Sequence, residues 1–294
     1  VPASYVAEVS EGLVDYAVDV EVNSRLLDPG YDAIMSIGQV VPHEVVGMAN
    51  YTKNVLVGCG GKSMIDKTHF LGAVYGMERL MGRDHSPVRR VFDYAEEHFL
   101  CSLPLQYILT VTTAERGRPT IKGLFAGRDR SLFEEAVRLS RMHNFDLLDK
   151  PLRKVVVYLD PSHFKSTWLG NKAIYRTRMA IADRGELTII APGVRQFGED
   201  QLVDGLIRKY GYSGTEQILE MVRQNEDLRG SLSAAAHLIH GSSEGRFDIV
   251  YAPGHLTDTE IERVGFGYMP LDEAIARFGP AAPHAGCNSV GSGV

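Results

Sequence analysis

Two histidines and a lysine with chemically useful side chains lie in the stretch from residue 36 to residue 83. His43 precedes Lys53 by ten residues, and His69 follows that lysine by sixteen. A neutral imidazole can bind a metal ion, and it can accept and return a proton near neutral pH. A lone histidine in an apolar context is usually a packed residue, and a lone lysine mostly solvates a surface. A functional role therefore depends on the three residues acting together.

A glycine cluster precedes the helix expected to carry His69. Its sequence, GCGGKS, resembles a phosphate-binding loop, but a P-loop requires a second glycine five positions before Gly61, where this chain has Leu56. The cluster is expected either to bind an anion through backbone amides or to form a tight turn. Gly60 and Gly61 are the predicted cofactor contacts of this cluster.

A helix is predicted to begin at about Thr68 and to carry His69 in its first turn. Its apolar stripe consists of Phe70, Leu71, Val74, Met77 and either Leu80 or Met81. The positive end of the helix dipole disfavours a charged imidazolium, and a neutral imidazole is the form that binds metal. A ligand role for His69 is consistent with this position.

The elements that must hold these residues follow an alternating pattern of strands and helices. The strand-like segments are Ala33–Ile37, Val55–Val57, Tyr107–Thr113, Val155–Leu159, Leu187–Pro192 and Phe247–Ala252. The alternation predicts an α/β fold, and the length of 294 residues favours two domains, each with a mainly parallel sheet covered by helices. The boundary is expected at Leu148–Leu152, where Pro151 precedes a new strand.

The net charge, the apolar runs and the cysteines argue against several classes of protein. The net charge of −6 argues against a nucleic-acid binder, and no apolar run approaches the ~18 residues that cross a bilayer. The cysteines Cys59, Cys101 and Cys287 have no CxxC spacing, so neither a disulfide framework nor a cysteine zinc site is indicated. A cytoplasmic enzyme acting on a small molecule is the expectation.

The stretch PHEVVGMANYTKNVLVG followed by KTHF resembles the lactate racemase superfamily, in which a His, a Lys and a second His occur with these spacings. These racemases and epimerases invert the hydroxyl-bearing carbon of 2-hydroxy acids. The resemblance implies a nickel-pincer nucleotide, the pyridinium-3,5-bisthiocarboxylic acid mononucleotide that holds nickel. It further implies that Lys53 bonds the cofactor covalently through a thioamide, that His69 is the protein's nickel ligand, and that His43 is a catalytic acid/base residue.

In the second domain the family has an Asn-x-Tyr-x-x-x-Lys-like helix start, and TWLGNKAIYRTRMAIADRG is the similar stretch here. Asn171 and Tyr175 match it, whereas Met179 stands where the family's lysine falls. The residues that the resemblance makes candidates for substrate binding are Lys172, Tyr175 and Arg178. The cations of this stretch, which include Arg176, favour a polar or sugar-derived acid.

The resemblance covers a C-terminal portion of the family's chain. No match for the family's N-terminal phosphate and carboxylate loop, or for its second catalytic histidine, precedes Ser36. Residues 1–148 are then the remainder of an N-terminal cofactor and catalytic domain, 149–279 a C-terminal α/β domain, and 280–294 a flexible tail. The partners expected besides a small-molecule 2-hydroxy acid are a missing N-terminal half or a homo-oligomer partner.

Two other functions compete with this interpretation. A zinc-dependent hydrolase could use His43 and His69 with Glu44 or Asp66, although the HExxH-type spacing is absent. A non-catalytic binding paralogue or fragment would contain no metal at all. His237 and His240 share one face of an alanine-rich helix, a pattern more typical of packing than of metal binding.

Overall fold

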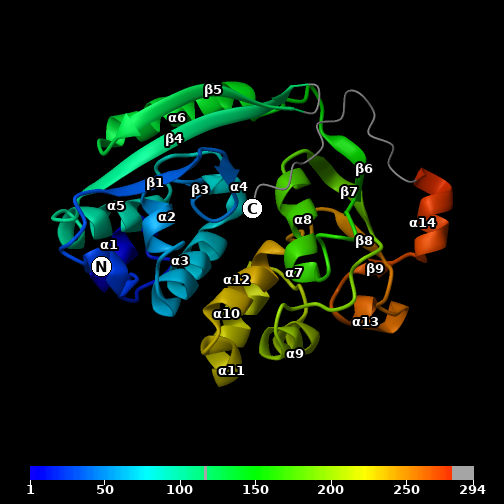
Figure 1. Cartoon of the computed structure of the whole chain (residues 1–294). Helices are drawn as coiled ribbons and strands as arrows, with labels where there is room; N and C mark the ends of the chain where they lie inside the picture. The colour runs from blue at the N-terminus through cyan, green and yellow to red at the C-terminus, as the bar shows by residue number, and fades with distance from the viewer. Residues whose placement is uncertain (116–117, 280–294) are drawn as a thin grey trace. The chain divides into compact units, whose positions relative to one another are not determined.

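The computed structural model describes residues 1–115 and 118–279, and Figure 1 shows its helices and strands. The chain divides into two compact units, Val1–Leu147 and a second unit that begins at Leu148. The fold is α/β, with one mixed and one parallel sheet covered by helices. In the described part of the chain, no helix is long and apolar enough to cross a membrane. The predicted tail, 280–294, lies outside the described residues.

The sheet of the first unit has the order β1-β4-β5. Its strands are β1 (Ile34–Gln39), β4 (Leu105–Glu115) and β5 (Arg118–Gly127). Strand β1 pairs with β4 in parallel, but β4 and β5 form an antiparallel hairpin, so this sheet is mixed rather than mainly parallel. No strand was predicted over β5, RPTIKGLFAG, because proline and glycine interrupt its apolar residues.

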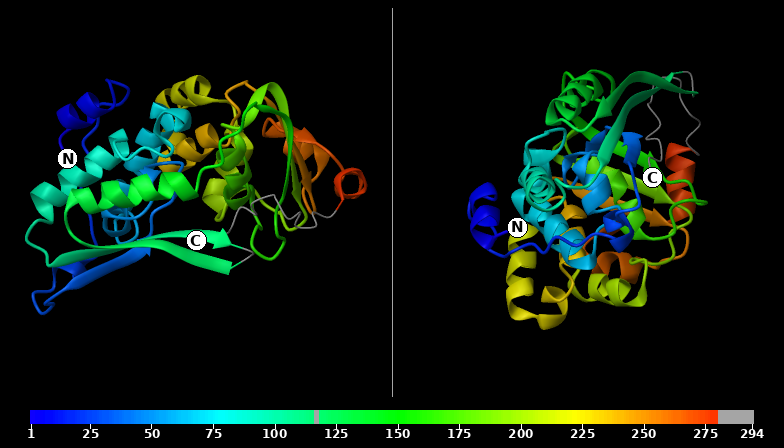
Figure 2. Two further views of the ribbon diagram at one scale, coloured as in Figure 1. Left: turned by 90° about the horizontal axis from the view of Figure 1, so that it is seen from above. Right: turned by 60° about the vertical axis from the view of Figure 1, so that its left-hand side comes forward.

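One face of this sheet is buried against helices. Tyr107, Leu109 and Val111 alternate along β4 and are each at most 1% exposed. Helix α6 (Arg130–His143) lies along the β4–β5 hairpin, as Figures 1 and 2 show. Its inward residue Phe133 is fully buried, so the hairpin and the helix enclose a common core.

The remaining elements of the first unit precede β4 in the chain. They are α1 (Ala3–Val9), η1 (Ser24–Leu27), β2 (Pro42–His43), β3 (Gly47–Met48), α2 (Thr52–Leu56), α3 (Lys62–Tyr75), α4 (Met77–Leu80) and α5 (Pro87–Phe99). The predicted strand Val55–Val57 was wrong, because these apolar residues lie in and just after the short helix α2. Periodicity alone does not separate a three-residue apolar run in a helix from one in a strand.

The second unit has a four-stranded, entirely parallel sheet in the order β6-β7-β8-β9. Its strands are β6 (Leu152–Tyr158), β7 (Ile181–Ala191), β8 (Asp248–Pro253) and β9 (Gly267–Tyr268). Its helices are α7 (Thr167–Gly170), α8 (Lys172–Thr177), α9 (Gln201–Tyr210), α10 (Thr215–Gln224), α11 (Glu226–Arg229), α12 (Leu232–His240), α13 (Asp258–Arg263) and α14 (Leu271–Phe278). Ile190 and Ala252 of the central strands pack against Ala274 of α14, which anchors that helix on the sheet.

Candidate active site

His43, Lys53 and His69 lie on three different elements of the first unit. His43 ends the short strand β2, Lys53 is the second residue of α2, and His69 lies in the middle of α3. All three side chains are partly buried. All three predicted residues thus lie in the first unit.

The ring of His43 has its Nδ1 atom fixed by the backbone. Nδ1 accepts a hydrogen bond from the Val45 N–H at 3.1 Å, and the Glu44 carboxylate lies 3.8 Å away. Because Nδ1 is an acceptor, a neutral His43 carries its proton on Nε2. Burial lowers the pKa of His43 to about 3, against the opposing effect of Glu44. The residue is therefore a neutral imidazole whose Nε2–H can donate a hydrogen bond.

The ring of His69 has the opposite tautomer. Its Nδ1 lies 2.7 Å from the Ile65 carbonyl oxygen, and a carbonyl can only accept, so Nδ1 carries the proton. Among the described residues, Nε2 of His69 has no hydrogen-bond partner, and its lone pair can bind a metal. A ring whose other nitrogen donates to a backbone carbonyl is the usual arrangement of a histidine ligand.

The predicted position of His69 in its helix was wrong. Helix α3 begins at Lys62, with Gly61 as its N-cap, so His69 is its eighth residue. Thr68 does not start the helix; its hydroxyl donates to the Met64 carbonyl at 2.7 Å. The helix dipole therefore has little influence on His69. Burial lowers the pKa of His69 and keeps its imidazole neutral.

The three side chains lie within electrostatic reach of one another. After burial, the positive charge of Lys53 contributes to lowering the pKa of both His43 and His69. His69 also lowers the pKa of His43. Charges influence one another's pKa only when they lie within about a Debye length. The charge of Lys53 therefore acts on both imidazoles within the first unit.

The turn before Lys53 has an unusual backbone. Asn50 and Tyr51 have φ angles of 70° and 57°, and Tyr51 combines this with a ψ of −138°. Residues with a Cβ rarely adopt these conformations, and they persist where surrounding contacts hold them. The Tyr51 ring stacks on Phe133 at 5.1 Å and packs on Tyr107 at 4.4 Å. Strain of this kind is concentrated at functional sites.

The structure gives Gly60 and Gly61 a packing role. A Cβ on Gly61 would overlap the Glu21 side chain, and a Cβ on Gly60 would overlap the Leu56 carbonyl. The Gly61 N–H donates to the Glu21 carbonyl, and the Glu21 carboxylate accepts from the Ser63 N–H at the start of α3. A protein carboxylate thus occupies this helix end. The proposed contact of Gly60 and Gly61 with the cofactor stays a prediction.

In the second unit, the predicted substrate residues differ in exposure. Tyr175 and Arg178 are 6% and 2% exposed, Lys172 is partly buried, and Arg176 is exposed. The Arg178 guanidinium donates to the carbonyls of His240 and Ser242, at the end of α12. These contacts account for the burial of Arg178 within the unit. Substrate binding by Lys172, Tyr175 and Arg178 stays a prediction.

Tyr175 belongs to a directional chain of hydrogen bonds. The Thr167 hydroxyl donates to the Phe197 carbonyl at 3.1 Å, so it accepts from Tyr212 at 2.9 Å. Tyr212 must then accept from His237 Nε2 at 3.0 Å, and His237 Nδ1 accepts from Tyr175 at 2.9 Å. Both nitrogens of His237 are thus engaged by hydroxyl groups, which makes it a packed histidine rather than a metal ligand.

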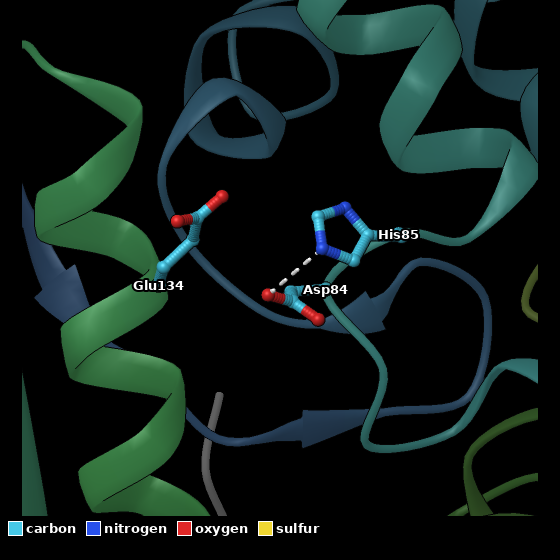
Figure 3. A group of neighbouring side chains, drawn as sticks. All are labelled: Asp84, His85 and Glu134. Atoms are coloured by element: carbon cyan, nitrogen blue, oxygen red, sulfur yellow. Dashed lines mark ion pairs between the residues drawn. The ribbon is translucent and has the colours of Figure 1, made fainter.

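One other group could hold a cation. Asp84 and His85, before α5, lie near Glu134 of α6, as Figure 3 shows. Arg141 approaches the Asp84 carboxylate at 3.4 Å, and Arg130 lies 3.5 Å from that of Glu134. Arginines therefore already compensate both carboxylates, and the group is better described as a surface ion-pair network.

The geometry gives little support to the zinc-hydrolase alternative. Within residues 1–115 and 118–279, Asp84, His85 and Glu134 form the one group of three potential ligands within 4.8 Å of one another. His43 and His69 do not join Glu44 or Asp66 in such a group, and the Asp66 carboxylate is paired with Lys62. A zinc site needs its ligands converging on one point.

The chain matches no protein-family model and no curated protein. Two solved structures share its fold. A protein from Thermotoga maritima, solved by a structural genomics consortium, has a TM-score of 0.82 and 24% identity, over 93% of this chain and 68% of that one. The lactate racemase apoprotein from Thermoanaerobacterium thermosaccharolyticum has a TM-score of 0.65 and 14% identity, over 87% of this chain and 59% of that one.

These likenesses confirm the fold that the sequence resemblance implied. The chain has a lactate racemase-like fold and spans 59% of the length of the racemase it matches.

Proposed function

We propose that this protein is an isomerase that inverts the C2 hydroxyl centre of a 2-hydroxy acid. The proposal is supported by the presence of His43, Lys53 and His69 in one compact unit, with opposite imidazole tautomers, in a chain of lactate racemase-like fold. Fold alone does not establish activity, but these residues would supply a hydrogen-bond donor, an amine and a metal ligand.

The residues fit a nickel-pincer nucleotide. His69 offers a neutral Nε2 whose tautomer is set by the Ile65 carbonyl, and Lys53 offers an amine for covalent attachment close to it. Imidazole is a suitable ligand for nickel. When bound, the nucleotide supplies the hydride chemistry at C2, and the protein supplies orientation and proton transfer.

His43 acts on the oxygen of the substrate. The tautomer fixed by Val45 carries its proton on Nε2, so His43 donates a hydrogen bond to the C2 oxygen, while the complementary group takes the hydroxyl proton. That complementary group is a second base. The substrate is a small 2-hydroxy acid, and the cations Lys172 and Arg176 favour a polar or sugar-derived one.

Isotope transfer at C2 tests this function. A preparation with measurable racemisation is given unlabelled substrate in heavy water, and the product is examined by NMR at early conversion. We expect no solvent deuterium at C2, because a hydrogen that moves as hydride does not exchange with water. A substrate deuterated at C2 should keep its label through inversion.

Cofactor-independent racemisation predicts the opposite result. Two bases that remove and replace a C2 proton would hold that proton on an imidazole, where it exchanges quickly with water. Deuterium entering C2 of the inverted product would therefore exclude the proposed chemistry.

A further inference from the structure

A buried arginine on α5 holds the strained turn that precedes Lys53. Arg89 is 0% exposed, and its Nη2 donates to the Met48 carbonyl at 2.7 Å and to the Asn50 carbonyl at 3.1 Å. Its Nη1 donates to the Thr52 hydroxyl at 2.5 Å. One guanidinium thus bonds to residues on both sides of Tyr51.

The contacts continue beyond the turn. The Thr52 hydroxyl donates to the Asp93 carboxylate at 3.2 Å, and Arg130 pairs with that carboxylate at 3.2 Å. The Arg89 guanidinium also lies 4.5 Å from the centre of the Phe133 ring, against which Tyr51 stacks. Helices α5 and α6 thereby fix both the backbone and the aromatic ring of the turn.

Stability does not explain why a charged residue occupies this position. Buried charges are costly, and well-packed apolar residues often replace them without loss. Nε of Arg89 has no hydrogen-bond partner among the described residues, which adds to that cost. A forked group with several donors is, however, well suited to holding two carbonyls and a hydroxyl in one geometry.

We infer that Arg89 is a positioning residue, which holds the turn over residues 48–52, with the positive φ angles of Asn50 and Tyr51, in the conformation that presents Lys53 for covalent attachment. Only the covalent attachment at Lys53 rests on the proposed function. The contacts by which Arg89 holds the turn do not depend on it. Arg89 acts through the backbone of the turn and does not need to touch the cofactor.

Three variants of the full chain test this role. Arg89→Met removes the donors and keeps an unbranched side chain, whereas Arg89→Lys keeps the charge and one donor group. Val91→Ala is the control, because Val91 is a fully buried residue of the same helix whose truncation lowers stability without removing a hydrogen bond to the turn. Thermal melts show which variants are folded at the assay temperature.

Hydrogen exchange of the Asn54 amide is the first measurement, because this N–H donates to the Tyr51 carbonyl at 3.0 Å. Arg89→Met should speed this exchange by about tenfold or more relative to helix α6, since the strained residues would relax. Arg89→Lys should give an intermediate value. Val91→Ala should change the exchange rates of the Asn54 amide and of the α6 amides by similar factors.

The second measurement is the fraction of Lys53 that carries an adduct after expression with the cofactor-synthesis proteins. It should fall about tenfold in Arg89→Met, recover in part in Arg89→Lys and persist in Val91→Ala. Unchanged exchange at Asn54 in Arg89→Met, or equal effects of Val91→Ala, would overturn the inference. An unmodified Lys53 in the parent chain would instead count against the proposed function, and the exchange result would still decide the role of Arg89.

Discussion

Replacing His69 with alanine is expected to remove nickel from the protein and to abolish racemisation. The Nε2 atom is the metal-binding atom left available by the Nδ1 bond to Ile65, and alanine supplies no ligand in its place. The fold should survive, because alanine favours the helix interior and the lost hydrogen bond contributes about 1 kcal/mol. Nickel per chain is measured by elemental analysis, together with a thermal melt.

The chain offers a matched control for this variant. The Nδ1 atom of His98 on α5 lies 2.9 Å from the carbonyl oxygen of Tyr94. This is the same contact, to the carbonyl four residues earlier in a helix, that His69 makes with Ile65. His98→Ala therefore removes an equivalent hydrogen bond and should keep nickel and turnover. If His69→Ala retains its nickel, the ligand assignment is wrong.

Replacing His43 with glutamine is expected to lower the rate of racemisation by about 10²–10³-fold, the usual effect of losing one positioned donor to an oxygen that develops charge. The glutamine carbonyl can still accept the Val45 N–H, so the turn between β2 and β3 should keep its shape. An amide N–H is a weaker hydrogen-bond donor than an imidazole N–H, so the C2 oxygen loses stabilisation. Nickel content should be unchanged, which separates this variant from His69→Ala.

His85→Gln is the control for His43→Gln. His85 lies in the same unit, is exposed, and pairs with Asp84 at 3.5 Å. Its replacement should leave the rate within a small factor of the parent. Equal rates for His43→Gln and the parent protein would remove His43 from the mechanism.

The sequence predicted the buried strands better than the exposed ones. Strands β4, β7 and β8 contain long apolar runs, because a strand that is covered by helices buries one or both of its faces. These runs made the three strands recognisable, and their positions agree with the predicted segments. Strand β5 alternates with exposed and glycine positions and was missed. Helix α2 was predicted as a strand because its five residues are too short for helical periodicity.

The candidate site also contains residues that the sequence predicted and residues that it did not. The spacing of His43, Lys53 and His69 matches that of a known family, so the amino-acid sequence was enough to predict these residues. Arg89 could not be predicted in this way, because an arginine on an amphipathic helix normally faces solvent and only tertiary packing buries it. The left-handed conformation of Tyr51 is likewise set by distant rings and donors rather than by its own residue type.

Mass mapping of Lys53 tests the central claim most directly. The protein is produced with and without the cofactor-synthesis proteins, and the peptide containing Tyr51–Lys62 is analysed beside Lys53→Arg and Lys67→Arg variants. The parent chain and Lys67→Arg should carry a nucleotide-sized adduct on Lys53, with nickel, only when the synthesis proteins are present. Lys53→Arg, which keeps the charge but lacks the primary amine, should carry none. An unmodified Lys53 in a preparation that racemises a 2-hydroxy acid would contradict the account.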